Sequence, residues 1–263
     1  MASEADRSLQ SRTALICGAS RGIGRACALE LARLGARVIV AARDPHALQK
    51  VLSELAGKDH LPLAVDFEDT AALRLSTAGT LEKVGTIHIL INNSGGPASG
   101  PTLAAQPEQF LAAFSRHLVA SQILAQLLVP GMKRAGYGRI LNIVSTSVRQ
   151  PIRGLGVSNT IRAAMAGWSK TLATELAPDG ITVNNILPGA TRTDRLAEIV
   201  RARAKTSGRS EEEIEAEMIE EIPAGRFARP EEIAAAVGFL ASPPAGYITG
   251  VSLAVDGGRT MAL

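Results

Sequence analysis

Short apolar segments rich in β-branched residues recur along this chain, and each is followed by a stretch with helical periodicity. Seven such segments span residues 13–17, 38–42, 61–65, 87–91, 139–144, 181–186 and 251–255, and the helical stretches include 24–34 and 107–134. Strands that alternate with helices form parallel sheets through right-handed crossovers, which place helices on both faces. The sequence therefore predicts a doubly wound, Rossmann-type α/β fold with a parallel seven-stranded sheet.

The composition supports strands that are buried on both faces. Apolar residues make up 46% of the 263 residues and aromatic residues only 3%, so Ala, Val, Leu and Ile must fill the core. No internal repeat or linker interrupts the chain, which predicts a single domain over residues 1–263. The formal net charge is +3 and no basic run carries interleaved aromatics, which argues against a nucleic-acid partner.

The cysteines and the N-terminal residues indicate in which cellular compartment the protein is expected. Cys17 and Cys27 are too few for a disulfide framework and lack the neighbours of a metal site, so we expect buried free thiols and no metal. Residues 1–11 form a polar tail without the apolar core of a signal peptide. No apolar run approaches the length of a membrane span. These features predict a cytoplasmic protein with no membrane partner.

An insertion over residues 193–227 precedes the last expected helix. Ser210 and Glu213 have the spacing of a capping box that opens a short helix, and Ile214, Met218 and Ile222 form one apolar stripe along it. The acidic residues of 211–221 either form a solvated helix face or belong to a lid over the substrate. The apolar stripe would then pack onto a cleft or onto a partner subunit.

A glycine-rich turn directly follows the first expected strand and precedes the first helix. It has the sequence Cys17-Gly18-Ala19-Ser20-Arg21-Gly22-Ile23-Gly24. Glycines permit a tight turn and a close approach of the backbone to a pyrophosphate, and the helix N-terminus offers free N–H groups. This context predicts a dinucleotide site that includes Gly18, Ser20, Gly22, Ile23 and Gly24.

The end of the second strand favours NADP over NAD. An NAD site places an acidic residue there to hold the ribose 2′-hydroxyl, whereas this strand ends at Ala42 and is followed by Arg43. Arg21 lies within the glycine turn. Two guanidinium groups and no carboxylate suit a 2′-phosphate, because each can donate two hydrogen bonds. Asp44 comes one residue late and is expected to cap the next helix.

Further motifs follow in order along the chain. They are Asp66 with Phe67, Asn92-Asn93-Ser94-Gly95, Pro188-Gly189-Ala190-Thr191-Arg192-Thr193, Tyr247-Ile248-Thr249-Gly250 and Asp256-Gly257-Gly258. Together with the glycine turn they resemble, over residues 13–258, the short-chain dehydrogenase/reductase family. The resemblance implies that Asp66 holds the adenine amino group, with Phe67, Asn93 and Gly95 in the same cofactor site. It also implies that Pro188, Gly189, Thr191 and Thr193 lie at the nicotinamide.

Some of these residues also have plainer interpretations. Asp66 is an acceptable helix cap, and Thr193 an ordinary cap that opens the insertion. Asn92 and Asn93 could tie two strands together, a role that the family itself assigns to them in part.

The resemblance fails at the family's catalytic residues, which are Asn, Ser, Tyr and Lys. The last two are spaced Tyr-x-x-x-Lys on one helix. Residues 167–173 match the family downstream and place Ser158 at the tyrosine position and Arg162 at the lysine position. Ser145 occupies the serine position, and His117 falls where the family has asparagine. The resemblance thus implies an atypical site that lacks the Tyr-x-x-x-Lys pair.

With Ser158 and Arg162 at the Tyr and Lys positions, the sequence does not identify the group that donates the proton. Carbonyl reduction needs a donor with a pKa close to the working pH, and a serine hydroxyl is far too weak an acid. Arg162 can supply a fixed positive charge and can hold the ribose, but it is effectively never deprotonated. His117 has an ordinary pKa near neutral, so the donor is His117, a water chain or a substrate group. Otherwise His117 is a packed or solvated helix residue without a chemical role.

Four arginines flank the expected substrate region: Arg149, Arg153, Arg192 and Arg195. If two or more converge on the cleft, the small-molecule substrate carries a carboxylate or phosphate. The leading hypothesis is an NADP(H)-dependent oxidoreductase that acts on a carbonyl or hydroxyl compound. The alternatives are a non-redox enzyme and an NADP-sensing binding protein. The resemblance also implies a homotetramer or homodimer, formed through the helices around 107–134 and 155–177.

Overall fold

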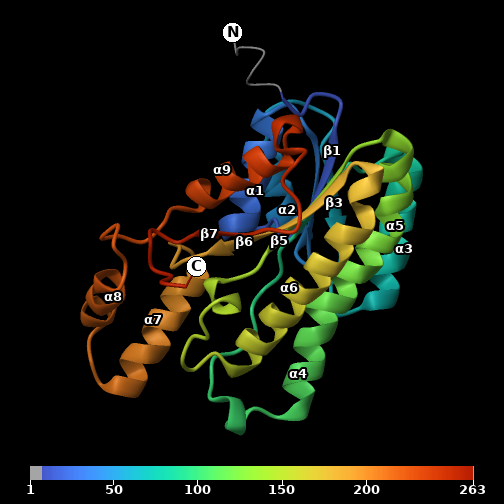
Figure 1. Cartoon of the computed structure of the whole chain (residues 1–263). Helices are drawn as coiled ribbons and strands as arrows, with labels where there is room; N and C mark the ends of the chain where they lie inside the picture. The colour runs from blue at the N-terminus through green and yellow to red at the C-terminus, as the bar shows by residue number, and fades with distance from the viewer. Residues whose placement is uncertain (1–7, 263) are drawn as a thin grey trace.

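Seven parallel strands run through the middle of the molecule (Figure 1). The computed structural model describes residues 8–262, and its sheet has the order β3-β2-β1-β4-β5-β6-β7. The predicted doubly wound parallel sheet is confirmed. Its strands are β1 (Thr13–Cys17), β2 (Arg37–Ala42), β3 (Leu61–Ala64), β4 (Ile89–Asn92), β5 (Gly138–Ile143), β6 (Ile181–Pro188) and β7 (Ser252–Val255).

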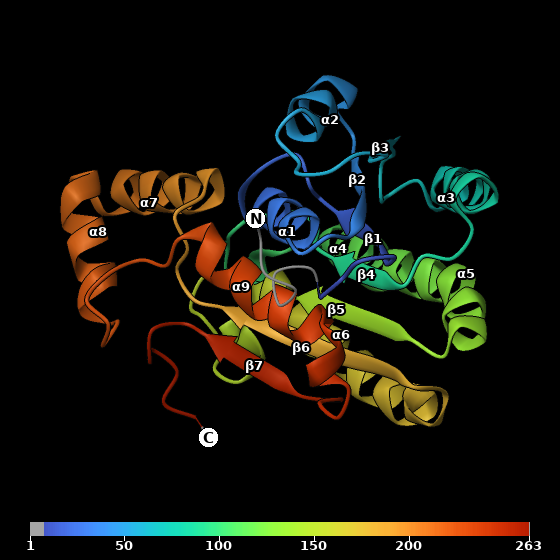
Figure 2. The ribbon, with the colours of Figure 1, turned by 90° about the horizontal axis from the view of Figure 1, so that it is seen from above.

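Helices cover both faces of the sheet (Figure 2). Adjacent side chains of β1 show how both faces are buried, because Leu15 packs into one apolar cluster and Ile16 into the other. One face carries α1 (Gly22–Arg33), α2 (Pro45–Leu52) and α9 (Pro230–Ala241), and the other α3 (Thr70–Val84), α5 (Ala120–Ala135) and α6 (Gly156–Leu176). Short 3₁₀ turns occur at Thr102–Ala104, Thr146–Val148, Ala177–Asp179 and Pro243–Ala245.

The strand order changes direction at β1. The chain first moves outward through β2 and β3 and then returns to the other side of β1 as β4. In open α/β sheets, ligands bind outside the carboxyl ends of the strands at such a point. The glycine turn follows β1 and Asn93 follows β4, so the topology brings these two segments to the same place.

The long helix expected over residues 107–134 is interrupted. α4 (Pro107–Phe114) continues into α5 through a π-helical turn at Ser115–Val119. By length and composition Pro107–Ala135 could cross a membrane, so the expectation that no apolar run approaches a span is wrong. Its α5 part, however, belongs to the core: Ile123, Leu124 and Leu128 are buried in the cluster that packs against the sheet. Core packing accounts for the apolar composition of α5.

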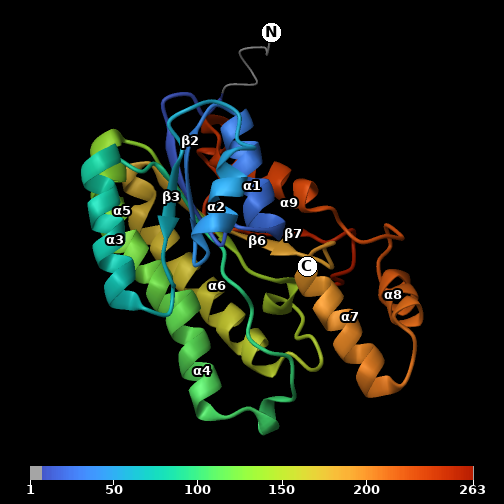
Figure 3. The same ribbon diagram turned by 180° about the vertical axis from the view of Figure 1, so that it is seen from behind.

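The insertion contains two helices, α7 (Asp194–Ser207) and α8 (Glu211–Glu220), which project from the layered body (Figures 1 and 3). The capping box that opens α8 is confirmed, because the Glu213 N–H donates to Ser210 Oγ and the Ser210 N–H donates to Glu213 Oε2. The sequence did not predict α7 as a helix.

The apolar stripe of α8 packs within the insertion. Ile214, Met218 and Ile222 are buried in one cluster with Val200 of α7 and with Phe227. The packing expected against a cleft is found for Met218 alone, which also lines the cavity described below, and packing onto a partner subunit stays a prediction. The two helices stabilise each other through a small core of their own.

The start of the described chain is anchored. Residues 1–7 of the expected polar tail lie outside the described residues. Leu9 is fully buried, and its N–H donates to the Leu34 carbonyl at 2.9 Å. The tail therefore ends before Leu9, whose side chain is part of the core.

Candidate functional site

A cavity of about 810 Å³ lies at the carboxyl ends of the strands. The segments that follow β1 to β6 line it, together with residues of α6 and of α7. Small-ligand pockets of about 300–1,000 Å³ occur at this position in α/β proteins. The cavity is therefore the candidate site.

Almost every residue that the sequence assigned to a cofactor lines this cavity. They are Gly18, Ser20, Arg21, Gly22, Ile23, Arg43, Asp66, Phe67, Asn93, Gly95, Pro188, Gly189, Thr191 and Thr193. Gly24 is the exception, because it lies inside the first turn of α1, where a Cβ would be 2.7 Å from Asn93 Nδ2. The fold thus gathers segments far apart in the sequence around one cavity.

The glycine turn is shaped by its backbone and by Asn93. Gly18 and Gly22 have φ of +60° and +55°, a region that side-chain-bearing residues rarely adopt. A Cβ on Gly18 would also lie 2.8 Å from Asn93 Nδ2. The Asn93 amide donates to the carbonyls of Cys17 and Gly18 at 3.2 and 3.3 Å, which ties the turn to the end of β4.

The N-terminus of α1 points its free backbone groups toward the cavity. Arg21 is the N-cap, and its side chain makes no capping hydrogen bond within the described chain. The first N–H groups of a helix have no partner inside the helix and carry a partial positive charge. Because Gly22 and Ile23 line the cavity, these groups are available to an anion there.

Polar side chains join neighbouring strands beside this turn. Asn92 donates to Asn142 at 2.8 Å, Asn142 to Asn185 at 3.0 Å, and Asn185 to Ser252 at 3.1 Å. These residues are register partners across β4, β5, β6 and β7. The tie expected of Asn92 is therefore part of a ladder that crosses half of the sheet, and sequence reasoning missed Asn142 and Asn185.

The end of β2 carries no acidic residue at its last position. Ala42 ends the strand, and the side chain of Arg43 extends into solvent, 77% exposed, with its Nη1 3.9 Å from Asp66 Oδ2. Asp44 caps α2, as predicted, by accepting from the N–H groups of His46 and Ala47.

Of the plainer roles suggested for two cavity-lining residues, Thr193 has the expected one and Asp66 does not. Asp66 Oδ1 accepts from the Glu68 N–H at 3.0 Å, whereas the N-cap of α3 is Asp69. Thr193 is the N-cap of α7, and its Oγ1 accepts from the Leu196 N–H at 3.4 Å. Local backbone bonding therefore holds both side chains at the edge of the cavity.

Ser145, Ser158 and Arg162 also line the cavity. Ser145 Oγ accepts from the Ser147 N–H at 3.1 Å, so the hydroxyl proton of Ser145 is free to donate into the cavity. Ser158 and Arg162 lie one turn apart on α6 and share its cavity face. The side-chain hydroxyl of Ser158 makes no hydrogen bond with another described residue.

Arg162 is largely buried. Its Nη1 donates to the Ile143 carbonyl at 2.8 Å, and no carboxylate of residues 8–262 forms an ion pair with it. Burial, together with the nearby Arg195, lowers the pKa of Arg162 to about 10. The guanidinium is still charged at neutral pH, so the cavity wall carries a positive charge without a counterion from the described chain.

His117 is not the near-neutral proton donor that its residue type suggests. It is only 4% exposed, and its Nδ1 shares a hydrogen bond of 2.7 Å with Ser94 Oγ. Burial, and then the charges of Arg162 and Arg116, lower the pKa of His117 to about 2. The imidazole is therefore neutral at working pH, and the expectation of a near-neutral pKa is wrong.

Hydrogen bonds from neighbouring residues fix the position of His117. It lies in the π-helical turn between α4 and α5, and Ser121 Oγ donates to its carbonyl at 2.6 Å. Its Nε2 is buried with no hydrogen-bond partner in the described chain, next to a cavity of about 20 Å³. That volume accommodates about one water molecule. The side chain is adjacent to the large cavity without lining it.

The four arginines expected near the substrate do not converge. Of these four only Arg195 lines the cavity. Arg149 donates to the carbonyls of Ser252 and Ala262, and Arg192 lies over the ring of Phe227 at 5.4 Å. Arg153 is exposed and lies outside the cavity lining. Sequence proximity therefore did not predict which of these side chains reach the cavity.

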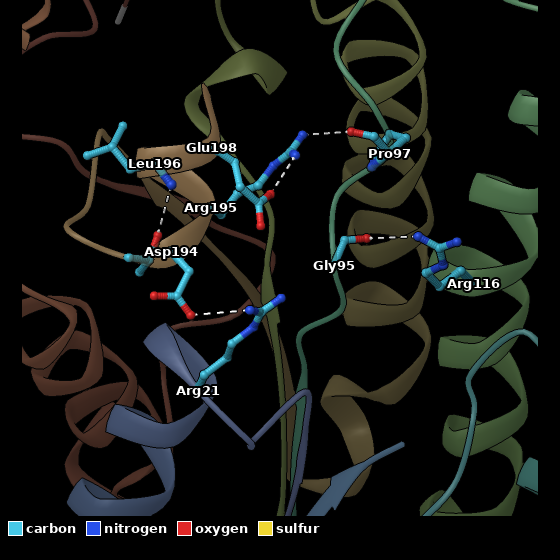
Figure 4. A network of polar contacts seen from close by, with 9 residues as sticks. Arg21, Gly95, Pro97, Arg116, Asp194, Arg195, Leu196 and Glu198 are labelled. Carbon is cyan, nitrogen blue, oxygen red and sulfur yellow. Dashed lines mark hydrogen bonds and ion pairs between the residues drawn. The ribbon is translucent and has the colours of Figure 1, made fainter. Parts of the chain in front are cut away.

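Three other arginines line the cavity that sequence reasoning did not select: Arg116, Arg203 and Arg259, the last of which pairs with Glu221. Arg116 pairs with Glu68 and donates to the Gly95 carbonyl at 3.4 Å (Figure 4). Arg203 lies on α7 eight residues after Arg195, and both line the cavity. The positions differ by two helical turns, so a periodicity search from Arg195 would have found Arg203.

The residues at the glycine-turn end fit a dinucleotide. Gly18 and Gly22 leave space where a side chain would project, and the start of α1 provides backbone donors. Arg21 and Arg43 line the same end, and both are more than two-thirds exposed, so an arriving phosphate can reach them.

Known proteins resemble this chain over nearly all of its length. Residues 18–260 match the family model described as enoyl-(acyl carrier protein) reductase. The chain is 32% identical to a 3-oxoacyl-(acyl-carrier-protein) reductase FabG of Pseudomonas aeruginosa, covering 97% of this chain and 100% of the relative. It is 33% identical to the NADPH-dependent reductase BacG of Bacillus subtilis, covering 97% and 100%.

Solved structures agree with these relatives. The L-sorbose reductase of Gluconobacter frateurii, complexed with NADPH and L-sorbose, superposes with a TM-score of 0.92 at 32% identity and covers 98% of this chain and 100% of its own. A 3-ketoacyl-(acyl-carrier-protein) reductase from Brucella melitensis, complexed with NADH, gives 0.85 at 31% identity, covering 96% and 100%. The fold, the cavity and these relatives together show that the chain belongs to the short-chain dehydrogenase/reductase family of oxidoreductases.

Proposed function

We propose that this chain is an NADP(H)-dependent oxidoreductase that interconverts a carbonyl and a hydroxyl compound through an atypical catalytic site. The observation that carries the proposal is the arrangement of one cavity. The glycine turn with Arg21 and Arg43 lines this cavity, and so do Ser145, Ser158 and Arg162. Relatives that use NADPH, including BacG and L-sorbose reductase, support the cofactor assignment.

The cofactor is held mainly by backbone and guanidinium groups. The N–H groups at the start of α1 bind the pyrophosphate, and Arg21 and Arg43 bind the 2′-phosphate. Asp66 and Phe67 border the adenine. Pro188, Gly189, Thr191 and Thr193 border the nicotinamide, with Asn93 and Gly95 between the two ends. Bound NADPH supplies the hydride that reduces the substrate carbonyl.

The remaining groups act on the substrate oxygen. The free hydroxyl proton of Ser145 donates to that oxygen, and Ser158 adds a second hydroxyl one helical turn from Arg162. The fixed charge of Arg162 stabilises the negative charge that develops there. The positive potential around Arg162 thus takes over part of the stabilisation that a tyrosine donor provides in other members of the family.

The proton comes from water in the cavity. His117 is neutral at working pH and does not line the large cavity, so it does not serve as the acid. Tyr137 is buried with its hydroxyl donating to the Ala241 carbonyl, and Tyr247 is fully exposed, so neither of these tyrosines lines the cavity. Without a side-chain acid of suitable pKa, we expect slower turnover of simple ketones than an intact Tyr and Lys would permit.

Transfer of deuterium from the reactive face of labelled NADPH to a panel of carbonyl compounds tests the proposal. We expect a deuterated alcohol from at least one compound, and loss of this product in Ser145→Ala. Tight NADPH binding with no transfer to any compound would favour the two alternatives, a non-redox enzyme or an NADP-sensing protein. The cavity residues at the nicotinamide end favour hydride transfer over a sensor, which needs only the adenine half.

The protein assembles as a homotetramer or homodimer in the cytoplasm in this proposal. Leu111 and Phe114 belong to α4, which is part of the 107–134 region expected to form the interface. Their side chains are 69% and 41% exposed. Cys17 and Cys27 are buried free thiols, and burial raises the pKa of each to about 12, so the fold does not depend on oxidation. Light scattering of the purified protein measures the assembly state.

A further inference from the structure

We infer that the substrate carries a carboxylate, which binds between the guanidinium groups of Arg162 and Arg195 beside the reacting carbonyl. The inference rests on the proposed function and adds to it the class of substrate: oxo acids and hydroxy acids. It follows from where the two side chains meet, from the charges that face them and from their distance to Ser158.

The two guanidinium groups border the same short segment. Arg195 Nη2 donates to the Pro97 carbonyl at 2.8 Å (Figure 4). A Cβ built on the adjacent Gly96 would lie 3.8 Å from Arg162 Nη2. Both arginines line the large cavity, one from α6 and the other from α7. Elements on opposite sides of the cavity therefore bring two cations together at Gly96 and Pro97.

The charges around this pair do not balance. Arg195 pairs with Glu198 at 3.3 Å, and Arg116 pairs with Glu68, whereas Arg162 has only the neutral Ile143 carbonyl. The proximity of Arg195 contributes to the lowered pKa of Arg162. A largely buried cation held beside another cation is unfavourable until an anion occupies the space between them.

The missing charge is that of a carboxylate. Within residues 8–262 one guanidinium of this group lacks a carboxylate partner, so one added negative charge restores the balance. A carboxylate carries that charge and accepts parallel hydrogen bonds from a guanidinium. The cofactor phosphates belong to the other end of the cavity, at the glycine turn.

Helix α7 presents a suitable surface to this anion. Arg195, Ile199 and Arg203 lie at successive turns and all line the cavity. The Arg195–Glu198 pair is 40% and 44% exposed, and such exposed pairs are weak, so Arg195 can exchange Glu198 for a ligand.

The spacing on α6 also limits the distance from the carboxylate to the reacting carbon. Ser158 and Arg162 are separated by one helical turn, about 6 Å along the axis. A substrate whose carbonyl faces Ser158 and Ser145 therefore places a carboxylate at Arg162 only if a few bonds separate the two groups. This favours 2-oxo and 3-oxo acids over long-chain keto acids.

Binding of benzoate and its neutral analogue benzamide tests the charge preference without turnover. We expect the NADPH-bound protein to bind benzoate about 10- to 100-fold more tightly than benzamide, the range of a charge-assisted hydrogen bond. Arg195→Gln should reduce this preference to about threefold or less. Arg201→Gln is the matched control, because Arg201 is an exposed residue of the same helix outside the cavity lining.

Equal binding of benzoate and benzamide, or equal effects of the two substitutions, would overturn the inference. Tighter binding of phenyl phosphate than of benzoate would overturn the assignment to a carboxylate. The thermal midpoints of both variants should match that of the parent protein, which separates a local effect from unfolding.

A matched substrate pair separates this inference from the proposed function. Phenylglyoxylate should have a kcat/KM about 10- to 100-fold above that of its methyl ester, and the ratio should fall in Arg195→Gln but not in Arg201→Gln. Turnover of both compounds without a difference contradicts only the carboxylate site. Absence of hydride transfer to every compound, with benzoate still preferred over benzamide, contradicts only the proposed function.

Discussion

Arg21 in the glycine turn and Asp194 at the first position of α7 form an ion pair, with 3.2 Å between Nη1 and Oδ2 (Figure 4). The pair joins the cofactor end of the cavity to the projecting helices of the insertion. Its side chains are 70% and 67% exposed, so the contact is weak and exchangeable. A 2′-phosphate that binds Arg21 must compete with Asp194, which couples cofactor binding to the position of α7.

Asp194→Asn should therefore tighten NADPH binding by up to about fivefold, because it removes the competitor of the phosphate for Arg21. NADH has no 2′-phosphate, and its affinity should not change. Calorimetric titration of both nucleotides measures the effect. Asp179→Asn, which removes an exposed ion pair with Lys133 away from the cavity, is the control. Weaker NADPH binding in Asp194→Asn would show that the carboxylate supports the cofactor site instead.

Arg43→Ala tests the preference for NADPH directly. The guanidinium lines the cavity just after β2, whose last residue is Ala42 and not an acidic residue. We expect a loss of about 1–3 kcal/mol in NADPH binding, the contribution of a charged hydrogen bond, and little change for NADH. Equal affinity of the parent protein for the two nucleotides, or tighter binding of NADH, would contradict the assignment to NADP.

The two serines should differ in their effect on turnover. Ser145→Ala removes the free donor to the substrate oxygen and should lower kcat by about 10- to 100-fold. Ser158→Ala should lower it by less than about tenfold, well below the factor of about 10²–10⁴ attributed to a general acid. Steady-state kinetics on one substrate compare the variants. A larger loss in Ser158→Ala than in Ser145→Ala would mean that Ser158 is the principal donor.

His117 should affect the pH dependence of stability rather than that of catalysis. Its folded pKa of about 2 lies below the ordinary value of 6.5, so the unfolded chain binds more protons between these values. Stability is therefore lost as the pH falls below about 6.5, and this group should account for about 2 kcal/mol of that loss at pH 5.

Urea unfolding at pH 7 and pH 5 measures this contribution, with His117→Gln as the comparison. The variant keeps a hydrogen-bonding side chain without a titrating ring, and its loss of stability between the two pH values should be smaller by about 2 kcal/mol. The same variant should retain the parent's pH profile of kcat. An inflection of kcat near neutral pH that disappears in His117→Gln would show that His117 is the proton donor after all.

The combined substitution Ser158→Tyr with Arg162→Lys should restore a proton donor and its neighbouring amine. Ser158 faces a cavity of about 810 Å³, which has room for the ring. We expect turnover of neutral ketones to rise by about 10- to 100-fold. Ser158→Phe with Arg162→Lys introduces the same ring without the hydroxyl and controls for shape. Equal turnover of the two double variants would show that a tyrosine hydroxyl cannot act in this cavity.

The sequence by itself determined the parallel sheet and the cofactor end of the cavity. Alternation of strands and helices, Gly18 and Gly22 in the turn, and the Ser210 capping box are signals in which neighbouring residues meet a backbone requirement. Such requirements hold wherever the segment lies in the fold, so spacing along the chain is sufficient to detect them.

Only the tertiary structure decided the charges and partners of the substrate end. Burial of the ring, and then the charges of Arg162 and Arg116, lower the pKa of His117. The two arginines that lie near Gly96 and Pro97 come from α6 and α7. The packing of the apolar stripe of α8 against α7 is likewise a tertiary contact. Desolvation and Coulomb interactions depend on three-dimensional distance, which sequence spacing does not encode for residues on separate elements.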